Sequence, residues 1–148
     1  MELQIPPSLM VVWRTRAGHE DMLFEILPLR QHAFLSSRVI RGVGGTQAPW
    51  SKRIATIGSV VNKDTTACFS VWTRAFVPGC KVFMQFIGGG YNWNTLGGEA
   101  RHRGDGSWQQ LKVSFKVAED TRGFAFLWND SSHCFAYFDN PVWLFLDI

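Results

Sequence analysis

The chain is poor in the features that mark several other classes of protein. Charged residues make up 18% of its 148 residues, and the Arg and Lys are scattered, so no basic stripe for a nucleic-acid backbone is predicted. Cys68, Cys80 and Cys134 form no CxxC pair and have no histidine at zinc-ligand spacing. A disulfide framework and a zinc site are therefore not indicated. Buried free thiols are expected instead, with one disulfide as the alternative.

Long apolar runs are also missing. No run approaches the roughly 20 residues that cross a bilayer, and the N-terminal sequence MELQIPPSLMVVWRTR has neither the basic start nor the apolar block of a signal peptide. We expect no membrane insertion and no targeting segment in this chain. Residues 1–148 are predicted to be one domain, in which residues 1–8, with Pro6-Pro7, are a linker or the remnant of a preceding domain.

Catalytic motifs are absent as well. None of the four histidines stands near a GxSxG or another nucleophile signature. Glu99 and Asp105 are the one pair of acids within a single loop. Paired carboxylates can hydrolyse a glycoside, but two acids in a glycine-rich loop are usually solvated. The chain is therefore predicted not to be an enzyme.

What the sequence does contain is an alternating, aromatic-rich pattern. Apolar residues make up 46% of the chain and aromatic residues 14%. Leu111, Val113, Phe115 and Val117 alternate with polar residues, which predicts a half-buried strand. Similar runs, separated by turn residues, predict further strands at 9–13, 22–27, 34–40, 54–61, 67–77, 81–87, 124–128 and 135–148. This spacing is typical of an all-β sandwich or barrel.

Residues 68–87 are predicted to form a hairpin, because Val77-Pro78-Gly79-Cys80 suits a tight turn between two strands. In the first strand the face predicted to enter the core carries Phe69, Val71, Thr73 and Ala75. Trp72 and Arg74 lie on the opposite face, where a stacking ring and a guanidinium would be adjacent.

The glycine-rich segment GGGYNWNTLGGEARHRGDG, residues 88–106, has no clear period. A loop of this length is uncommon unless it is functional or hides a short strand, here 96–103. In an extended conformation Tyr91 and Trp93 would point to one side and Asn94 to the other. Each ring is either an exposed platform for a ligand or a buried plug.

The same segment carries two arginines at alternate positions. Arg101 and Arg103 would share one face of an extended strand, with His102 opposite. They would either contact an acidic polysaccharide or serve as solvated charges that discourage strand pairing. A later residue, Trp128, either joins this surface together with Asn129 or enters the core.

Four segments together resemble a known family. They are FSVWTRAF (69–76), GSWQQLKVSF (106–115), TRGFAFLW (121–128) and AYFDNPVWLF (136–145). They resemble carbohydrate-binding modules of the jelly-roll group that includes families four, nine, sixteen and twenty-two, over about residues 34–148. The resemblance implies an all-β, two-sheet antiparallel jelly-roll β-sandwich without catalytic activity, in a larger protein that targets a glycan.

The resemblance also implies a structural calcium, with Asp139 at the matching position. The usual NGDFE opening of the family is missing, and Gly18-His19-Glu20-Asp21 is a loose substitute. Asp139 has a simpler role open to it, because Asp-Asn-Pro is a good turn whose side chain can bond the backbone two residues on.

The predicted function is recognition of a poly- or oligosaccharide, because sugars bind to exposed aromatic planes flanked by polar groups. The predicted ligand-binding residues are Tyr91, Trp93, Asn94, Glu99, Arg101, Arg103, Trp128, Asn129, Trp72 and Arg74. The alternative is a trimerisation domain at the C-terminus of a phage tail fibre or tailspike, in contact with capsule or lipopolysaccharide as host receptor. Either reading places the protein outside the cell or on a virion.

Overall fold

In the computed structural model, the described residues are 58–131 and 133–146, together with four strands nearer the N-terminus. Those four are β1 (Glu2–Gln4), β2 (Leu23–Leu27), β3 (Val39–Val43) and β4 (Arg53–Ala55). The remaining strands are β5 (Ser59–Val61), β6 (Thr66–Ala75), β7 (Cys80–Ile87), β8 (Asn94–Arg101), β9 (Trp108–Lys116), β10 (Thr121–Asn129) and β11 (Ala136–Leu146). No helix occurs among these residues.

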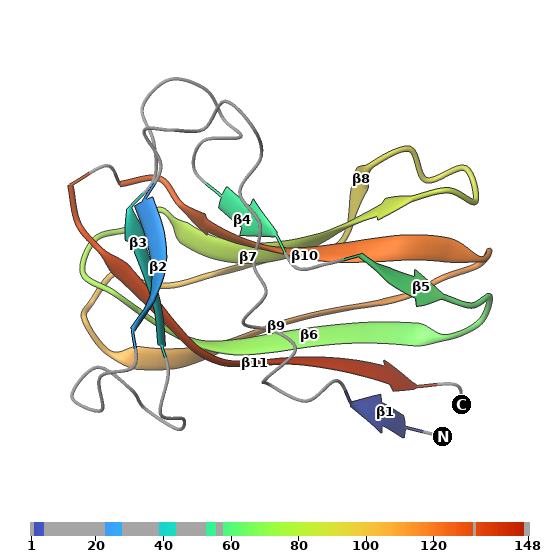
Figure 1. Ribbon diagram of the computed structural model, residues 1–148, viewed down its shortest axis with the longest axis horizontal. Coiled ribbons are helices and arrows are strands. Elements are labelled where there is room, and N and C mark those ends of the chain that lie inside the picture. Colours follow the sequence, from blue (N-terminus) through green and yellow to red (C-terminus); the bar gives the residue numbers. More distant parts are fainter. Residues whose placement is uncertain are drawn as a thin grey trace.

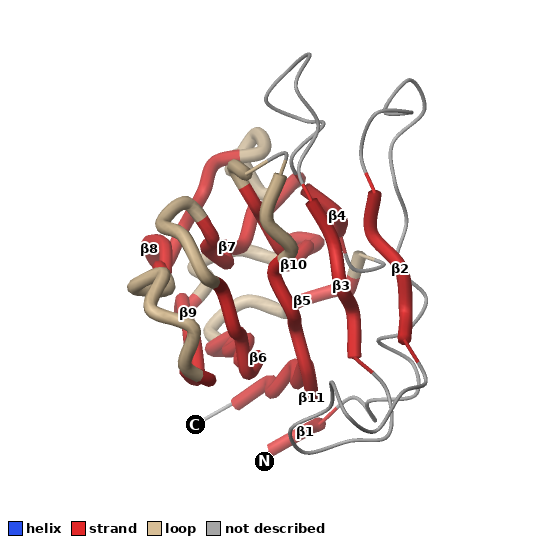
Figure 2. Tube along the Cα trace, turned by 90° about the vertical axis from the view of Figure 1, so that its left-hand side faces the viewer, coloured by secondary structure: helices blue, strands red, loops and turns tan. Residues whose placement is uncertain are grey.

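The strands form two antiparallel sheets that face each other across one core (Figures 1 and 2). Sheet A has the order β2-β3-β11-β6-β9, with β1 paired to the end of β11. Sheet B has the order β4-β10-β7-β8, with β5 also paired to β10. The predicted all-β, two-sheet antiparallel sandwich is therefore confirmed. Residues 2–4, inside the segment predicted as a linker, form a strand of sheet A.

The core lies where the predicted alternation places it. In β6 every second residue from Ala67 to Ala75 is buried, and in β9 Leu111 and Val113 are buried while Lys112 and Ser114 are exposed. The ring of Phe69 meets that of Trp143 on β11 edge to face, with 5.5 Å between centroids. The period of two in these segments thus correctly indicated which face of each strand is apolar.

The predicted hairpin at residues 68–87 is wrong. The strands β6 and β7 belong to different sheets, since β6 pairs with β9 and β11 whereas β7 pairs with β8 and β10. Residues 76–79 carry the chain from one sheet to the other, and Gly79 has a φ of 111°. Both strands bury an apolar face, so the chain reverses across the core and not within one sheet. A Pro-Gly turn is compatible with either connection.

The predicted strand at 54–61 is two strands. Both β4 and β5 pair with β10, Ala55 opposite Phe126 and Ser59 opposite Gly123. Gly58 stands just before β5, and a Cβ at this position would lie 2.6 Å from the ring of Phe124. A residue without a side chain is needed there because the backbone passes over that ring.

The Asp-Asn-Pro sequence is a bulge and not a turn. β11 continues through it, since Asp139 lies opposite Trp72 and Val142 opposite Ser70, with a register shift between them. Asn140 takes a φ of 53°, a conformation that asparagine tolerates. Proline lacks a backbone N–H, and bulges are among the places where a sheet accepts it. The predicted strand at 9–13 lies outside the described residues, and so do residues 34–38 of the strand predicted at 34–40.

Candidate functional site

The outer face of sheet B carries aromatic and charged side chains instead of small polar ones. On β7 the core receives Val82, Met84 and Phe86, and on β10 it receives Ala125 and Leu127. Alternation therefore turns the intervening residues outward. They are Lys81, Phe83 and Gln85 on β7, and Arg122, Phe124, Phe126 and Trp128 on β10.

Aromatic rings form the floor of this face. Phe83 stacks on Phe126 with 5.1 Å between ring centroids, and it contacts Trp128 at 5.9 Å. Phe83 and Phe126 are each 4% exposed, so they support the surface and do not themselves offer a ring to a ligand. The ammonium of Lys81 lies 4.8 Å from the centre of the half-buried Trp128 ring, at cation–π distance.

One acid on β8 joins two basic side chains at the edge of the face. Glu99 accepts a hydrogen bond from Lys81 Nζ at 2.8 Å and one from Arg101 Nη2 at 2.8 Å. The hydrogen bond from Lys81, followed by the nearby charges of Lys81 and Arg101, lowers the pKa of Glu99 from its usual value. The predicted site residues Glu99, Arg101 and Trp128 are thus brought together. The alternative that placed Trp128 in the core is wrong.

Trp93 projects beside the same face from the turn before β8. Its side chain is 44% exposed and contacts Phe124 at 5.1 Å between centroids. Asn92 and Trp93 have φ values of 50° and 62°, and the Trp93 N–H donates to the Phe86 carbonyl at 2.7 Å. A left-handed conformation is costly for a side chain as large as tryptophan, and such strain clusters at ligand sites. The platform reading of Trp93 fits this geometry.

Tyr91 does not accompany Trp93, as the extended conformation had predicted. The left-handed turn rotates the two rings apart, and Tyr91 packs on Phe86 and Phe115 at the end of the sandwich. Its hydroxyl accepts the N–H of Ala118 at 2.7 Å. Tyr91 is therefore a plug. Asn94 is exposed at the start of β8, where its N–H donates to the Tyr91 carbonyl.

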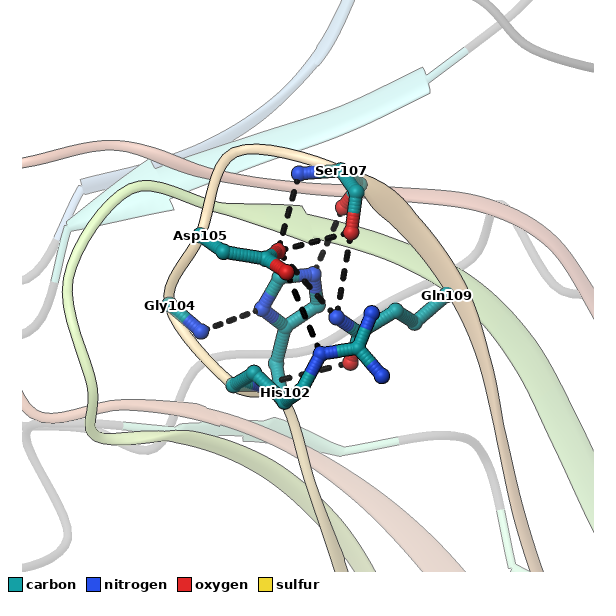
Figure 3. Close-up of polar contacts among 6 residues, drawn as sticks. His102, Gly104, Asp105, Ser107 and Gln109 are labelled. Atoms are coloured by element: carbon teal, nitrogen blue, oxygen red, sulfur yellow. Dashed lines mark hydrogen bonds and ion pairs between the residues drawn. The ribbon is translucent and has the colours of Figure 1, made fainter.

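The loop that follows β8 is closed by its own hydrogen bonds (Figure 3). His102 is buried, and its Nδ1 accepts the N–H of Gly104 at 2.8 Å. Nδ1 is then unprotonated, so Nε2 carries the hydrogen and donates it to the Ser107 carbonyl at 2.7 Å. Both ring nitrogens of His102 are therefore used within the loop.

Asp105 completes the loop and binds Arg103. It accepts hydrogen bonds from the hydroxyl and the N–H of Ser107, from Gln109 Nε2 and from Arg103 Nε. The bonds from Ser107, ahead of Arg103, hold the pKa of Asp105 well below its usual range. Arg103 therefore serves the loop and does not share the outer face of sheet B with Arg101. The prediction that the two arginines act together is not supported by this arrangement.

The other predicted residues lie elsewhere. Trp72 and Arg74 occupy the outer face of sheet A, and Arg74 Nε donates to the Gly106 carbonyl at 2.8 Å while its guanidinium covers Phe76. Asn129 is 2% exposed and ties down the next loop, donating to the Cys134 carbonyl and accepting from the Ser131 N–H. Its role is structural.

Asp139 is fully buried in β11. The described residues contain no group of three His, Cys, Asp or Glu side chains able to hold a metal, so this part of the chain does not by itself fit a calcium site. Gly18 to Asp21 lie outside it. Cys68, Cys80 and Cys134 form no disulfide; Cys80 is buried and the other two are half-buried. Burial raises the pKa of Cys80 far above its usual value. The described residues include no helix with the length and hydropathy of a membrane span.

Sequence reasoning missed Lys81, Gln85, Phe124 and their neighbours. The signal was available, because KVFMQFI and GFAFLW each place alternate residues on one face. Aromatic residues on both faces of a strand make the core face hard to recognise from the sequence. Phe86 belongs to the core cluster and Phe83 does not, although both are phenylalanines of the same strand.

Comparisons with known proteins establish the kind of sandwich. The sequence matches no protein family and no curated protein. Among solved structures it is similar to the family-22 xylan-binding domain of Paenibacillus barcinonensis Xyn10C, with a TM-score of 0.66 and 12% identity over 99% of this chain and 94% of that one. The predicted jelly-roll sandwich is therefore confirmed.

Two further structures have the same fold. The family-22 and xylanase modules of Clostridium thermocellum Xyn10B, complexed with xylohexaose, give a TM-score of 0.65 and 11% identity over 93% of this chain and 26% of that one. The family-6 C-terminal module of the laminarinase LamC from Zobellia galactanivorans gives 0.56 and 13%, over 97% and 98%. None of these three is a phage tail protein.

Proposed function

We propose that this domain is a non-catalytic carbohydrate-binding module that holds a poly- or oligosaccharide on the outer face of sheet B. The observation that carries the proposal is the exposed Trp93, fixed in a left-handed turn beside that face. Sugars offer apolar C–H faces to aromatic planes and hydroxyls to polar groups. Trp93 and Trp128 supply the planes, and Glu99, Arg101 and Gln85 supply hydrogen-bonding groups.

The structural likeness supports the same reading, because the similar structures include a xylan-binding domain and a pair of family-22 and xylanase modules complexed with xylohexaose. The proposal needs no calcium, and a calcium held by Asp139 stays a prediction. A role outside the cell or on a virion stays a prediction too. No contact among the described residues favours the trimeric phage domain over a binding module.

Substitution of Trp93 tests the proposal. We expect Trp93→Ala to weaken binding to a soluble polysaccharide about tenfold or more, since exposed aromatic anchors dominate binding energy. Affinity gel electrophoresis in xylan, galactan and laminarin measures this. Phe76→Ala is the matched control, because Phe76 is an aromatic residue of similar exposure, 48% against 44%, that contacts Tyr137 of sheet A.

Retention of the wild-type protein by none of the polymers would contradict the proposal. An equal loss of retention in both variants, with both still folded, would also contradict it, because binding would then not depend on the outer face of sheet B. Thermal unfolding of each variant shows separately that it is folded.

A further inference from the structure

Two arginine–acid pairs lie two residues apart and differ in what surrounds them. The Arg101–Glu99 pair stands at the edge of the outer face of sheet B, beside Lys81, and the Arg101 side chain is 60% exposed. The Arg103–Asp105 pair closes the next loop, and the Arg103 side chain is 71% exposed. Exposure alone does not distinguish the two arginines, but their positions do.

The guanidinium of Arg101 keeps most of its hydrogen-bond donors. An arginine has five N–H donors, and the described residues give Arg101 one side-chain hydrogen bond, from Nη2 to Glu99. Nη2 carries one hydrogen on each of the two edges that bind a carboxylate in bidentate fashion. Because Glu99 uses one of these hydrogens, a complete second edge of the fork stays open.

The charges of the ion-paired group formed by Lys81, Glu99 and Arg101 do not cancel. Glu99 is a single carboxylate held between Lys81 and Arg101, so this trio carries a net charge of one positive unit. Arg122 is an exposed basic residue at the other end of the same face, where it lies opposite Ile87 of β7. Asp130 lies at the end of that face, where it accepts the indole N–H of Trp128. Among the described residues of this face, three basic side chains and two acidic ones leave a net charge of one positive unit.

We infer that the module selects polysaccharides that carry carboxylates, that is, uronic acids, and that Arg101 is the residue that recognises the carboxylate. The inference rests on the proposed binding function and names the class of sugar for the same face. A planar carboxylate matches the open edge of a guanidinium, and such charge-assisted pairs are about twice as strong as neutral hydrogen bonds. Lys81 holds Glu99 so that the fork of Arg101 is fixed in place.

The experiment compares polymers that differ only in charge. Binding is measured by calorimetry against glucuronoxylan, the same polymer after chemical reduction of its carboxyls, and a sulfated xylan; polygalacturonate and its reduced form make a second pair. We expect roughly tenfold to a hundredfold tighter binding of each uronate polymer than of its reduced partner. Salt should reduce that difference.

Three variants locate the selectivity. Arg101→Gln should remove the preference for the uronate, so that the acidic polymer and its reduced partner bind with equal affinity. Arg101→Lys keeps the charge but not the fork, so it should restore a minor part of the preference. Arg103→Gln changes an arginine of similar exposure outside the face, and it should behave as the wild type.

Each alternative result has a distinct meaning. Equal binding of the acidic and reduced polymers would overturn the inference while the proposed function stands. Tighter binding of the sulfated xylan than of glucuronoxylan would overturn the carboxylate as the recognised group. Failure to bind either member of both polymer pairs would overturn the inference, and the neutral polymers tested with Trp93→Ala would then decide the proposed function separately. Loss of the preference in Arg103→Gln would remove Arg101 as its source.

Discussion

The edge of sheet B and the loop that follows it are built from the same residue types and do different work. At the edge, Glu99 bridges Lys81 and Arg101 on a floor of aromatic rings, and donors of Arg101 stay open. In the loop, Asp105 collects hydrogen bonds from four donor groups. An arginine beside an acid is therefore no guide to function until the partners of both are known.

The largest effect is expected from a change that moves the edge of sheet B. Gly97 has a φ of 83°, and a Cβ there would lie 2.5 Å from the Ser114 carbonyl oxygen of β9. We expect Gly97→Ala to lower the free energy of unfolding by about 3 kcal/mol or more and to weaken polysaccharide binding. Chemical denaturation measures the first effect and calorimetry the second.

Gly98→Ala is the matched control for this change. Gly98 has a similar φ of 75°, but a Cβ added there would meet no atom within 4 Å, so its cost is the left-handed conformation alone, about 1 kcal/mol. Equal losses in the two variants would mean that the contact between β8 and β9 does not hold the edge in place.

A smaller effect separates the loop from the face. His102→Ala leaves the partly buried Gly104 N–H and Ser107 carbonyl without their partner, which should cost about 2 kcal/mol of unfolding free energy. Binding per folded molecule should not change, because the loop does not contribute to the outer face of sheet B. Denaturation and calorimetry on the same sample test both statements.

Arg103→Gln is the control variant for the loop. It removes only an exposed ion pair, which should change the unfolding free energy by between nothing and about 1 kcal/mol. If His102→Ala weakened sugar binding as strongly as it weakened stability, the loop would belong to the binding face after all.

The smallest effect is the dependence of stability on pH. The pKa values of Glu99 and Asp105 are both below their usual values of 4.5 and 3.8. Each carboxyl therefore adds stability above its unfolded pKa, and this contribution is lost as the pH falls through its folded pKa. Since the pKa of Asp105 is held very low, its contribution should persist to lower pH than that of Glu99.

Unfolding free energies of the wild type, Glu99→Gln and Asp105→Asn between about pH 2 and pH 6 test this order. Glu99→Gln should make the unfolding free energy depend less on pH just below pH 4.5, the usual pKa of that carboxyl. Asp105→Asn should have the same effect at a lower pH. Identical profiles for the two variants would show that the carboxyls are equivalent, contrary to the difference between the edge and the loop.

The faces of the strands could be predicted from the sequence, because alternation is a local property of an extended chain. Phe69, Val71, Leu111 and Val113 are buried as expected. The turn of Asn92 and Trp93 could not be predicted, since two successive left-handed residues are held there by a hydrogen bond to Phe86 on a neighbouring strand. With this turn, Trp93 lies beside the outer face of sheet B, against Phe124, and Tyr91 packs on Phe86 and Phe115.

The sequence by itself determined that this protein is an all-β sandwich, because the period of two and the turn residues act over a few positions. Its high aromatic content also indicated that some aromatic rings lie outside the core. The tertiary structure decided which sheet each strand joins, as β6 and β7 show. It also decided that Arg101 lies on the aromatic face while Arg103 closes a loop. Strand pairing and the partners of a charged side chain depend on residues far apart in the chain, and a local sequence pattern does not indicate which distant residues come together.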